Sequence, residues 1–274
     1  MAAEYKRILI LCKTYPSPSS KHVETSCVAG MEESGRLIRL FPVPFRLITD
    51  SQQFKKWQWI RARVTKASDD HRVESYRISV DTIETQGPPQ DTKDGWAERK
   101  QAISSVEVFD DFEALEHARQ SRGITLGLLR PTRLASLQIS KAKASEWTAD
   151  EIAKLMQAQN QGSLFDELTE QRFLKTLKKL PVDFHYHYEC GDHQPVQSYK
   201  HKLADWEAGA LYWNICRHQG WEAKFQQKYF TELAGKDLLF LMGTIHRFPD
   251  QWLIVSVIYP PRPSPARLDQ GMLF

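Results

Sequence analysis

The segment WQWIRARV, residues 57–64, alternates between two kinds of side chain. Successive residues of an extended chain point to opposite faces, so this period of two predicts a β-strand. One face would carry Trp57, Trp59, Arg61 and Arg63, and the other Gln58, Ile60, Ala62 and Val64. A strand of this kind needs partner strands and a core beneath one face, which neighbouring segments must supply.

The first 83 residues contain three more segments of strand character. Residues 7–12 (RILILC) form a compact apolar run suited to a buried strand. Residues 36–43 (RLIRLFPV) alternate charged with apolar positions, and residues 75–83 have a similar composition. Together these strands predict a small, mostly β barrel or curled sheet in the N-terminal half.

The rest of the chain mixes helical and strand patterns. Helices are expected over residues 96–104, 110–120, 203–216 and 221–234, and strands over residues 124–129, 134–139, 184–189, 237–246 and 252–259. We therefore predict an α+β protein, with a β-rich, barrel-like N-terminal half and a mixed α/β C-terminal half joined by a helical linker. The predicted divisions are a β-rich domain over 1–144, the linker over 145–170, an α+β domain over 171–260 and an extended tail over 261–274.

Composition narrows the functional class only slightly. The chain has 37 basic and 34 acidic residues, a net charge of +3, so any contact with nucleic acid has to come from local clustering of charge. The four cysteines are widely spaced and include no CxxC pair. With neither a signal-peptide pattern nor an apolar run of membrane-spanning length, we expect a cytoplasmic protein with reduced thiols.

One short motif occurs twice, as QGSLF at residues 161–165 and as QGMLF at residues 270–274. Both segments resemble the motif with which bacterial polymerases, mismatch-repair proteins and clamp loaders bind the DNA sliding clamp: Gln, two variable residues, Leu and Phe. The resemblance covers these segments alone. It implies two pairs of anchors for a hydrophobic clamp pocket, Leu164 with Phe165 and Leu273 with Phe274. It also implies that the amides of Gln161 and Gln270 bond at the pocket rim.

The character of the tail supports a partner independently of the resemblance. An aromatic and an aliphatic side chain on a Pro-bounded tail have no core to bury in, but in a partner's groove they become hot spots. Two copies would also permit bivalent binding to a ring with repeated pockets. The alternatives are that Leu164 and Phe165 staple the linker to the core and that the tail folds back.

Imidazole and thiol groups are concentrated between residues 185 and 201. Such groups at short spacing can hold Zn²⁺, and the candidate ligands are His187, Cys190 and His201. The alternative is a solvated strand face, because His185 and His187 fall on the side opposite the aromatic residues of the same strand.

His201, Asp205 and Glu207 are candidate catalytic residues, with Lys200 and Lys202 beside them. Carboxylates together with a lysine are groups that Mg²⁺-dependent nucleases use to cut a phosphodiester bond. The structural alternative is that the two carboxylates open a helix, where they favour the positive end of its dipole.

Basic and aromatic residues are densest at Lys55, Lys56, Trp57, Trp59, Arg61 and Arg63. Aromatic rings beside guanidinium groups on a β-barrel are typical of a protein that binds single-stranded nucleic acid. The alternative is that the tryptophans face a core and the arginines extend from its rim.

Three functional hypotheses follow from these features. The first is a DNA-transaction factor in repair, replication or genome defence, which is recruited to the sliding clamp and binds or cleaves DNA. The second is a non-enzymatic regulator that occupies clamp pockets. The third is a metal-dependent hydrolase, with Mg²⁺ or Zn²⁺, that acts on a substrate other than DNA.

Overall fold

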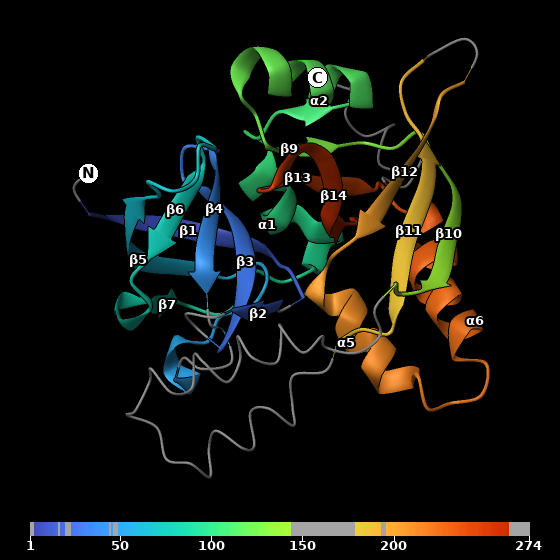
Figure 1. Ribbon diagram of the computed structural model, residues 1–274, viewed down its shortest axis with the longest axis horizontal. Coiled ribbons are helices and arrows are strands. Elements are labelled where there is room, and N and C mark those ends of the chain that lie inside the picture. Colours follow the sequence, from blue (N-terminus) through green and yellow to red (C-terminus); the bar gives the residue numbers. More distant parts are fainter. Residues whose placement is uncertain are drawn as a thin grey trace, which may run out of the picture.

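The computed structural model describes residues 3–15, 17–19, 23–43, 45, 49–143, 179–192 and 196–262. These residues form two seven-stranded sheets, the first from the N-terminal third of the chain and the second from the remainder (Figure 1). The mixed α+β class with a barrel in the N-terminal half confirms the predicted fold class. Both clamp-like motifs, and the predicted linker helix that begins near residue 148, lie outside the described residues.

Five strands of the first sheet close into a barrel. They run in the order β1-β3-β4-β6-β5, and β5 pairs back onto β1. The strands are β1 (Glu4–Lys13), β3 (Val23–Glu32), β4 (Leu37–Val43), β5 (Trp59–Lys66) and β6 (Ser75–Ile78). Two short strands, β2 (Ser17–Ser19) and β7 (Glu84–Gln86), pair with β3 and β5. Closure removes the unpaired edges through which open sheets aggregate.

Burial along β5 follows the alternation of its sequence. Ile60, Ala62 and Val64 are fully buried in the barrel core, whereas Arg61 and Arg63 face solvent. Trp57 departs from the predicted alternation. It precedes β5, has a left-handed backbone with φ of 66°, and is buried in the core shared with the second sheet, whereas Trp59 is half-buried against the same core.

The second sheet runs in the order β10-β11-β12-β14-β13-β9-β8. Its strands are β8 (Val108–Phe109), β9 (Leu126–Leu129), β10 (Arg133–Lys141), β11 (Val182–Glu189), β12 (Ser198–Leu203), β13 (Leu239–Ile245) and β14 (Phe248–Ile258). Strands β8, β9 and β10 fall within the range predicted for the N-terminal domain. They belong to the second sheet because β9 pairs with β13 and β10 pairs with β11.

Helices cover the face of this sheet that lies away from the barrel (Figure 1). They are α2 (Phe112–Arg122), α5 (Trp206–Ile215), α6 (Trp221–Gln226), the π-helical turn η3 (Gln227–Thr231) and α7 (Glu232–Ala234). Among the described residues, no helix is long and apolar enough to cross a membrane.

The second sheet is therefore the middle of three layers. On β13, Phe240 and Met242 face the helices, whereas Leu239 and Leu241 face the barrel. The outer face of the barrel meets them with Leu9, Leu11, Ala29 and Met31, and helix α1 (Lys93–Ile103) adds Trp96 and Ile103. This shared apolar core joins the two sheets. Clefts form at the edges of the core.

Candidate functional site

A cleft of about 350 Å³ opens where the barrel, α1 and the start of α5 meet. Its walls come from separate stretches of the chain and combine cations, aromatic rings and two carboxylates. The residues of this inter-sheet cleft are Lys13, Lys55, Lys56, Trp57, Pro89, Trp96, Arg99, Asp205, Trp206, Glu207 and Tyr259. The cleft thus unites residues predicted separately for nucleic-acid binding and for catalysis.

Lys56 is the central cation of the inter-sheet cleft. Its ammonium lies 3.1 Å from Glu207 Oε2 and 3.8 Å from Asp205 Oδ2, and it donates a hydrogen bond of 3.0 Å to the carbonyl of Val257. Burial opposes the charge, but the carboxylates of Asp205 and Glu207 outweigh it and raise the pKa of Lys56. Lys56 therefore remains charged and ties the barrel loop to α5.

Asp205 is committed to structural hydrogen bonds. Its Oδ1 accepts from the backbone N–H of Glu207 at 2.8 Å, which caps α5, and its Oδ2 accepts from the hydroxyl of Ser256 at 3.0 Å. Burial raises its pKa, and the side chain is 2% exposed. Asp205 is buried and paired with Lys56, so it positions Lys56 and the helix, whereas Glu207, 50% exposed, can reach a ligand.

Lys13 lies at the end of β1 and supplies a second cation. Its ammonium is 3.7 Å from the ring centre of Phe45 and donates to the carbonyl of Phe54 at 3.2 Å. Burial lowers its pKa to about 8, although Glu207 and Asp205 act in the opposite direction. Its charge is therefore present at neutral pH and titrates just above it.

The aromatic wall depends on two unusual backbone conformations. Trp57 and Trp96 have φ of 66° and 68°, a region that bulky residues adopt only under strong tertiary constraint. Their rings meet edge to face at 5.9 Å, and the guanidinium of Arg99 lies over both, 4.6 Å from the ring centre of Trp96. The ring of Tyr259 contacts Trp96 at 5.1 Å. Strain of this kind clusters at functional sites.

The aromatic wall also borders a second cavity of about 350 Å³. Trp96 and Tyr259 line both cavities, and Lys228 and Lys236 line the far one. Cations thus line the cavities on both sides of the shared pair of rings, although Lys228 is paired with Glu232 at 2.8 Å.

The remaining basic residues predicted for nucleic acid lie elsewhere. Arg61 and Arg63 project from the exposed face of β5, where Arg61 lies 4.2 Å from the ring centre of Tyr5 and 3.4 Å from the carboxylate of Glu84. Trp59 is half-buried beneath the guanidinium of Arg7. The predicted set therefore divides between the inter-sheet cleft and the outer surface of the barrel.

His201 does not join Asp205 and Glu207. Its ring packs against Phe112 at 4.7 Å, and its Nδ1 lies 2.9 Å from the hydroxyl of Tyr188, on the helix-covered face of the second sheet. Burial lowers its pKa to about 4. The three candidate catalytic residues are therefore not assembled, because His201 is not among the residues that line the cleft.

The candidate zinc ligands are also separated. His201 pairs with Tyr186, whereas His187 pairs with Lys200, so the two imidazoles project from opposite faces of neighbouring strands. Cys190 accepts a hydrogen bond of 3.2 Å from the backbone of Phe112. Burial raises the pKa of its thiol to about 11. These three residues cannot share one ion. His187, on the face of β11 opposite the buried aromatic residues, fits the alternative of a solvated strand face.

Several residues of the cleft lack a strong sequence signal. Lys13, Arg99 and Tyr259 are isolated in sequence and reach the cleft through the packing of distant elements. The spacing of Trp96 and Arg99 by three residues is the one local hint, because residues three apart share a helix face. Sequence reasoning missed Trp96, Arg99 and Tyr259.

The chain matches two described sequence families. DUF8758, a domain of unknown function, matches residues 4–105, which hold the barrel and α1. DUF8757, also a domain of unknown function, matches residues 106–274, which hold all the strands of the second sheet. Comparison with curated proteins gave no match. With more than half of its length matched by DUF8757, the chain belongs to that family.

Proposed function

We propose that this protein binds single-stranded nucleic acid in the inter-sheet cleft and is recruited to the DNA sliding clamp through its two Gln-x-x-Leu-Phe segments. One observation carries the binding proposal: cations and aromatic rings from separate parts of the chain line one cleft. The cations are Lys13, Lys55, Lys56 and Arg99, against the two carboxylates Asp205 and Glu207.

The residues of the cleft fall into two groups: cations suited to phosphates and aromatic rings suited to bases. Lys55 is exposed and Lys13 is partly exposed, so both can meet a phosphate without breaking an ion pair of the fold. The half-buried rings of Tyr259 and Trp206 offer surfaces on which bases stack. Such stacking tolerates any base, so we expect affinity with weak sequence preference.

The barrel supports the same class of ligand. Five-stranded barrels of the OB type bind oligonucleotides, chiefly on the face of their second and third strands. Here the corresponding face, on β3 and β4, carries Ala29 and Met31 into the core shared with the second sheet. A ligand is therefore expected at the margin of this face, where the inter-sheet cleft lies.

Binding is favoured over cleavage by the state of Asp205. A two-carboxylate Mg²⁺ site needs both carboxylates to reach the ion, but Asp205 is buried and its charge is paired with Lys56. We therefore favour a non-enzymatic factor that holds a single strand near the clamp over a nuclease.

The binding proposal is tested with fluorescein-labelled oligonucleotides of DNA and RNA, single- and double-stranded, by fluorescence anisotropy across a salt series. Lys55→Glu should weaken single-strand binding about tenfold and reduce the salt slope. The matched control is Lys224→Glu, which reverses an exposed charge on α6, and Arg61→Ala/Arg63→Ala tests the barrel surface. If only Arg61→Ala/Arg63→Ala weakens binding, the ligand lies on the barrel surface and the cleft proposal fails.

Recruitment is tested separately by calorimetric titration of the full chain with purified sliding clamp. Leu273→Ala/Phe274→Ala and Leu164→Ala/Phe165→Ala remove one pair of anchors each, and the combined variant removes both. We expect each pair to weaken binding and the combined variant to abolish it. Absence of binding by the wild type would remove the clamp from the proposal and leave the cleft untouched.

A further inference from the structure

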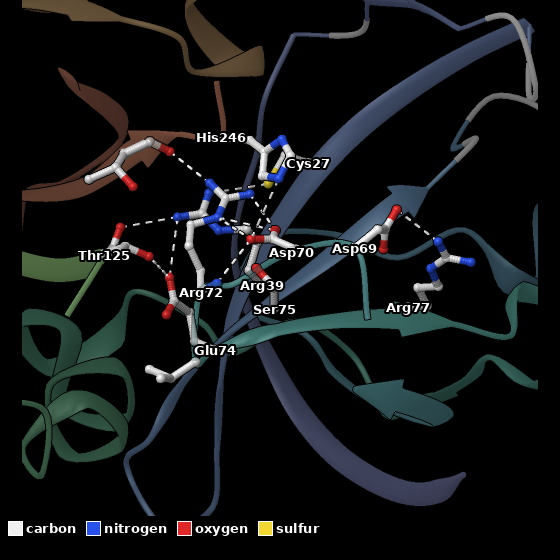
Figure 2. Close-up of polar contacts among 12 residues, drawn as sticks. Cys27, Arg39, Asp69, Asp70, Arg72, Glu74, Ser75, Arg77, Thr125 and His246 are labelled. Carbon is white, nitrogen blue, oxygen red and sulfur yellow. Dashed lines mark hydrogen bonds and ion pairs between the residues drawn. The ribbon is translucent and has the colours of Figure 1, made fainter. Parts of the chain in front are cut away.

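A polar contact between the two sheets lies away from the cleft, where residues 67–74, the loop between β5 and β6, meet β13 (Figure 2). A guanidinium nitrogen of Arg72 donates to the carbonyl of Thr244 at 2.9 Å, and one of Arg39 donates to the carbonyl of Thr125 at 3.1 Å. Both arginines are buried, so these bonds fix the loop and β4 against the second sheet.

Three side chains gather at the solvent edge of this contact: Asp70 and His71 from the loop, and His246 from the turn between β13 and β14. Each offers one ligand atom, and the three atoms lie within 4.8 Å of one another. His246 Nε2 is 4.0 Å from Asp70 Oδ1. The two imidazole rings are stacked, with centres 6.0 Å apart, and both histidines are exposed.

The carboxylate of this cluster is held in place from behind. Arg72 Nε donates to Asp70 Oδ1 at 2.9 Å, and Arg72 Nη2 donates to Oδ2 at 2.6 Å. The backbone N–H of Arg72 adds a bond of 3.1 Å to Oδ1. Partners of this kind orient a carboxylate toward its other neighbours, as they do around known metal sites.

We propose that Asp70, His71 and His246 bind a divalent transition-metal ion, with Zn²⁺ as the reference ion. Two imidazoles and a carboxylate are a ligand set that zinc accepts, and the imidazoles favour it over Mg²⁺ or Ca²⁺. Ligand atoms each about 2.1 Å from a tetrahedral ion lie about 3.4 Å apart. The 4.0 Å separation of His246 and Asp70 is somewhat longer than this spacing, so binding would require a small rotation of the two histidines, which are both exposed.

One neighbouring charge opposes metal binding at this site, and a bound ion would have a consequence for the fold. The guanidinium of Arg72 places a positive charge behind the carboxylate, so the neutral imidazoles supply most of the affinity. The ligands come from the barrel and from the second sheet, so a bound ion would tie the two sheets together. This inference is independent of the proposed nucleic-acid and clamp binding.

The experiment titrates chelator-treated full-length protein with Zn²⁺ by calorimetry and follows thermal unfolding with and without the ion. The test variant is His71→Gln/His246→Gln, and the matched control is His117→Gln/His218→Gln, which changes two exposed histidines elsewhere.

Wild type and control should bind one ion with the same affinity and gain the same rise in Tm. The test variant should bind at least about tenfold more weakly and lose that rise. Identical isotherms for wild type and test variant, or no binding by the wild type, would overturn the proposal.

Discussion

The ammonium of Lys56 lies 3.1 Å from the carboxylate of Glu207, a residue 151 positions further along the chain. This contact joins the loop before β5 to the first turn of α5, and the same ammonium neutralises the buried Asp205. Lys56 thus stabilises the fold and also contributes positive charge to the inter-sheet cleft.

Replacing Lys56 with methionine should destabilise the protein strongly. The change leaves the buried carboxylate of Asp205 without its cation, and removing one partner of a buried pair costs about 3–5 kcal/mol of unfolding free energy. Urea denaturation measures the change. The control is Glu207→Gln, whose carboxylate is half exposed and should contribute less than about 1 kcal/mol. Equal stability of K56M and wild type would contradict a role for Lys56 in the fold.

The affinity for single-stranded nucleic acid should fall as the pH rises from 7 to 9. Burial lowers the pKa of Lys13 to about 8, so its ammonium, present at pH 7, is largely lost at pH 9. Anisotropy at constant ionic strength measures this, and Lys13→Gln should flatten the profile. A profile that is unchanged in K13Q would show that another group titrates.

The titration of Lys13 should change stability in the opposite direction to affinity: stability rises with pH, whereas affinity falls. The pKa of Lys13 is about 8 in the fold, below the ordinary value of 10.5. Between these values the unfolded chain binds the extra proton, so the unfolding free energy contributed by Lys13 rises with pH over that window. Denaturation at pH 7.5 and 9.5 should therefore show a smaller gain in K13Q than in wild type.

The buried polar contact between the sheets should matter more than the exposed ion pair beside it (Figure 2). Thr125 donates a hydrogen bond to the buried carboxylate of Glu74, so Thr125→Val should cost about 1–3 kcal/mol. Arg77 and Asp69 form an ion pair of 2.8 Å on the surface, and Asp69→Asn should cost less than about 1 kcal/mol. Chemical denaturation of the two variants compares them; the reverse order of stabilities would contradict this assignment.

The two sheets should unfold together. Leu241 is fully buried in the core that they share, and Leu241→Ala should lower the unfolding free energy by about 2–5 kcal/mol. Tryptophan fluorescence and far-ultraviolet circular dichroism should give coincident transitions in wild type and variant. Two separate transitions in either protein would show that the sheets fold independently.

Local sequence patterns predicted where strands and helices lie better than they predicted which elements pack together. The period of two over residues 60–64 reports which side of β5 faces the barrel core, because burial imposes that period directly. Trp57 and Trp96 could not be placed in the same way. Their left-handed backbones are imposed by tertiary packing, which no propensity of tryptophan anticipates.

The candidate site depends on contacts between distant segments, so the sequence predicted its parts but not its assembly. Lys56 is predicted as a nucleic-acid contact and Glu207 as a catalytic carboxylate, and the fold places them in one cleft. His201 is close to Glu207 in sequence yet faces another layer, because its ring projects from β12 toward Phe112 and Tyr188 whereas Glu207 lies in the first turn of α5. His71 and His246 were not predicted as ligands, because they lie far apart in the sequence.

The position of β14 has a consequence for how the protein is made. It is the last of the described strands to leave the ribosome, yet it lies in the middle of its sheet, between β12 and β13. Until it arrives, the apolar outer face of the barrel, including Leu9 and Met31, has no complete sheet to cover it. The nascent chain should therefore depend on chaperones through most of its synthesis, and a fragment that stops after the barrel should be poorly soluble.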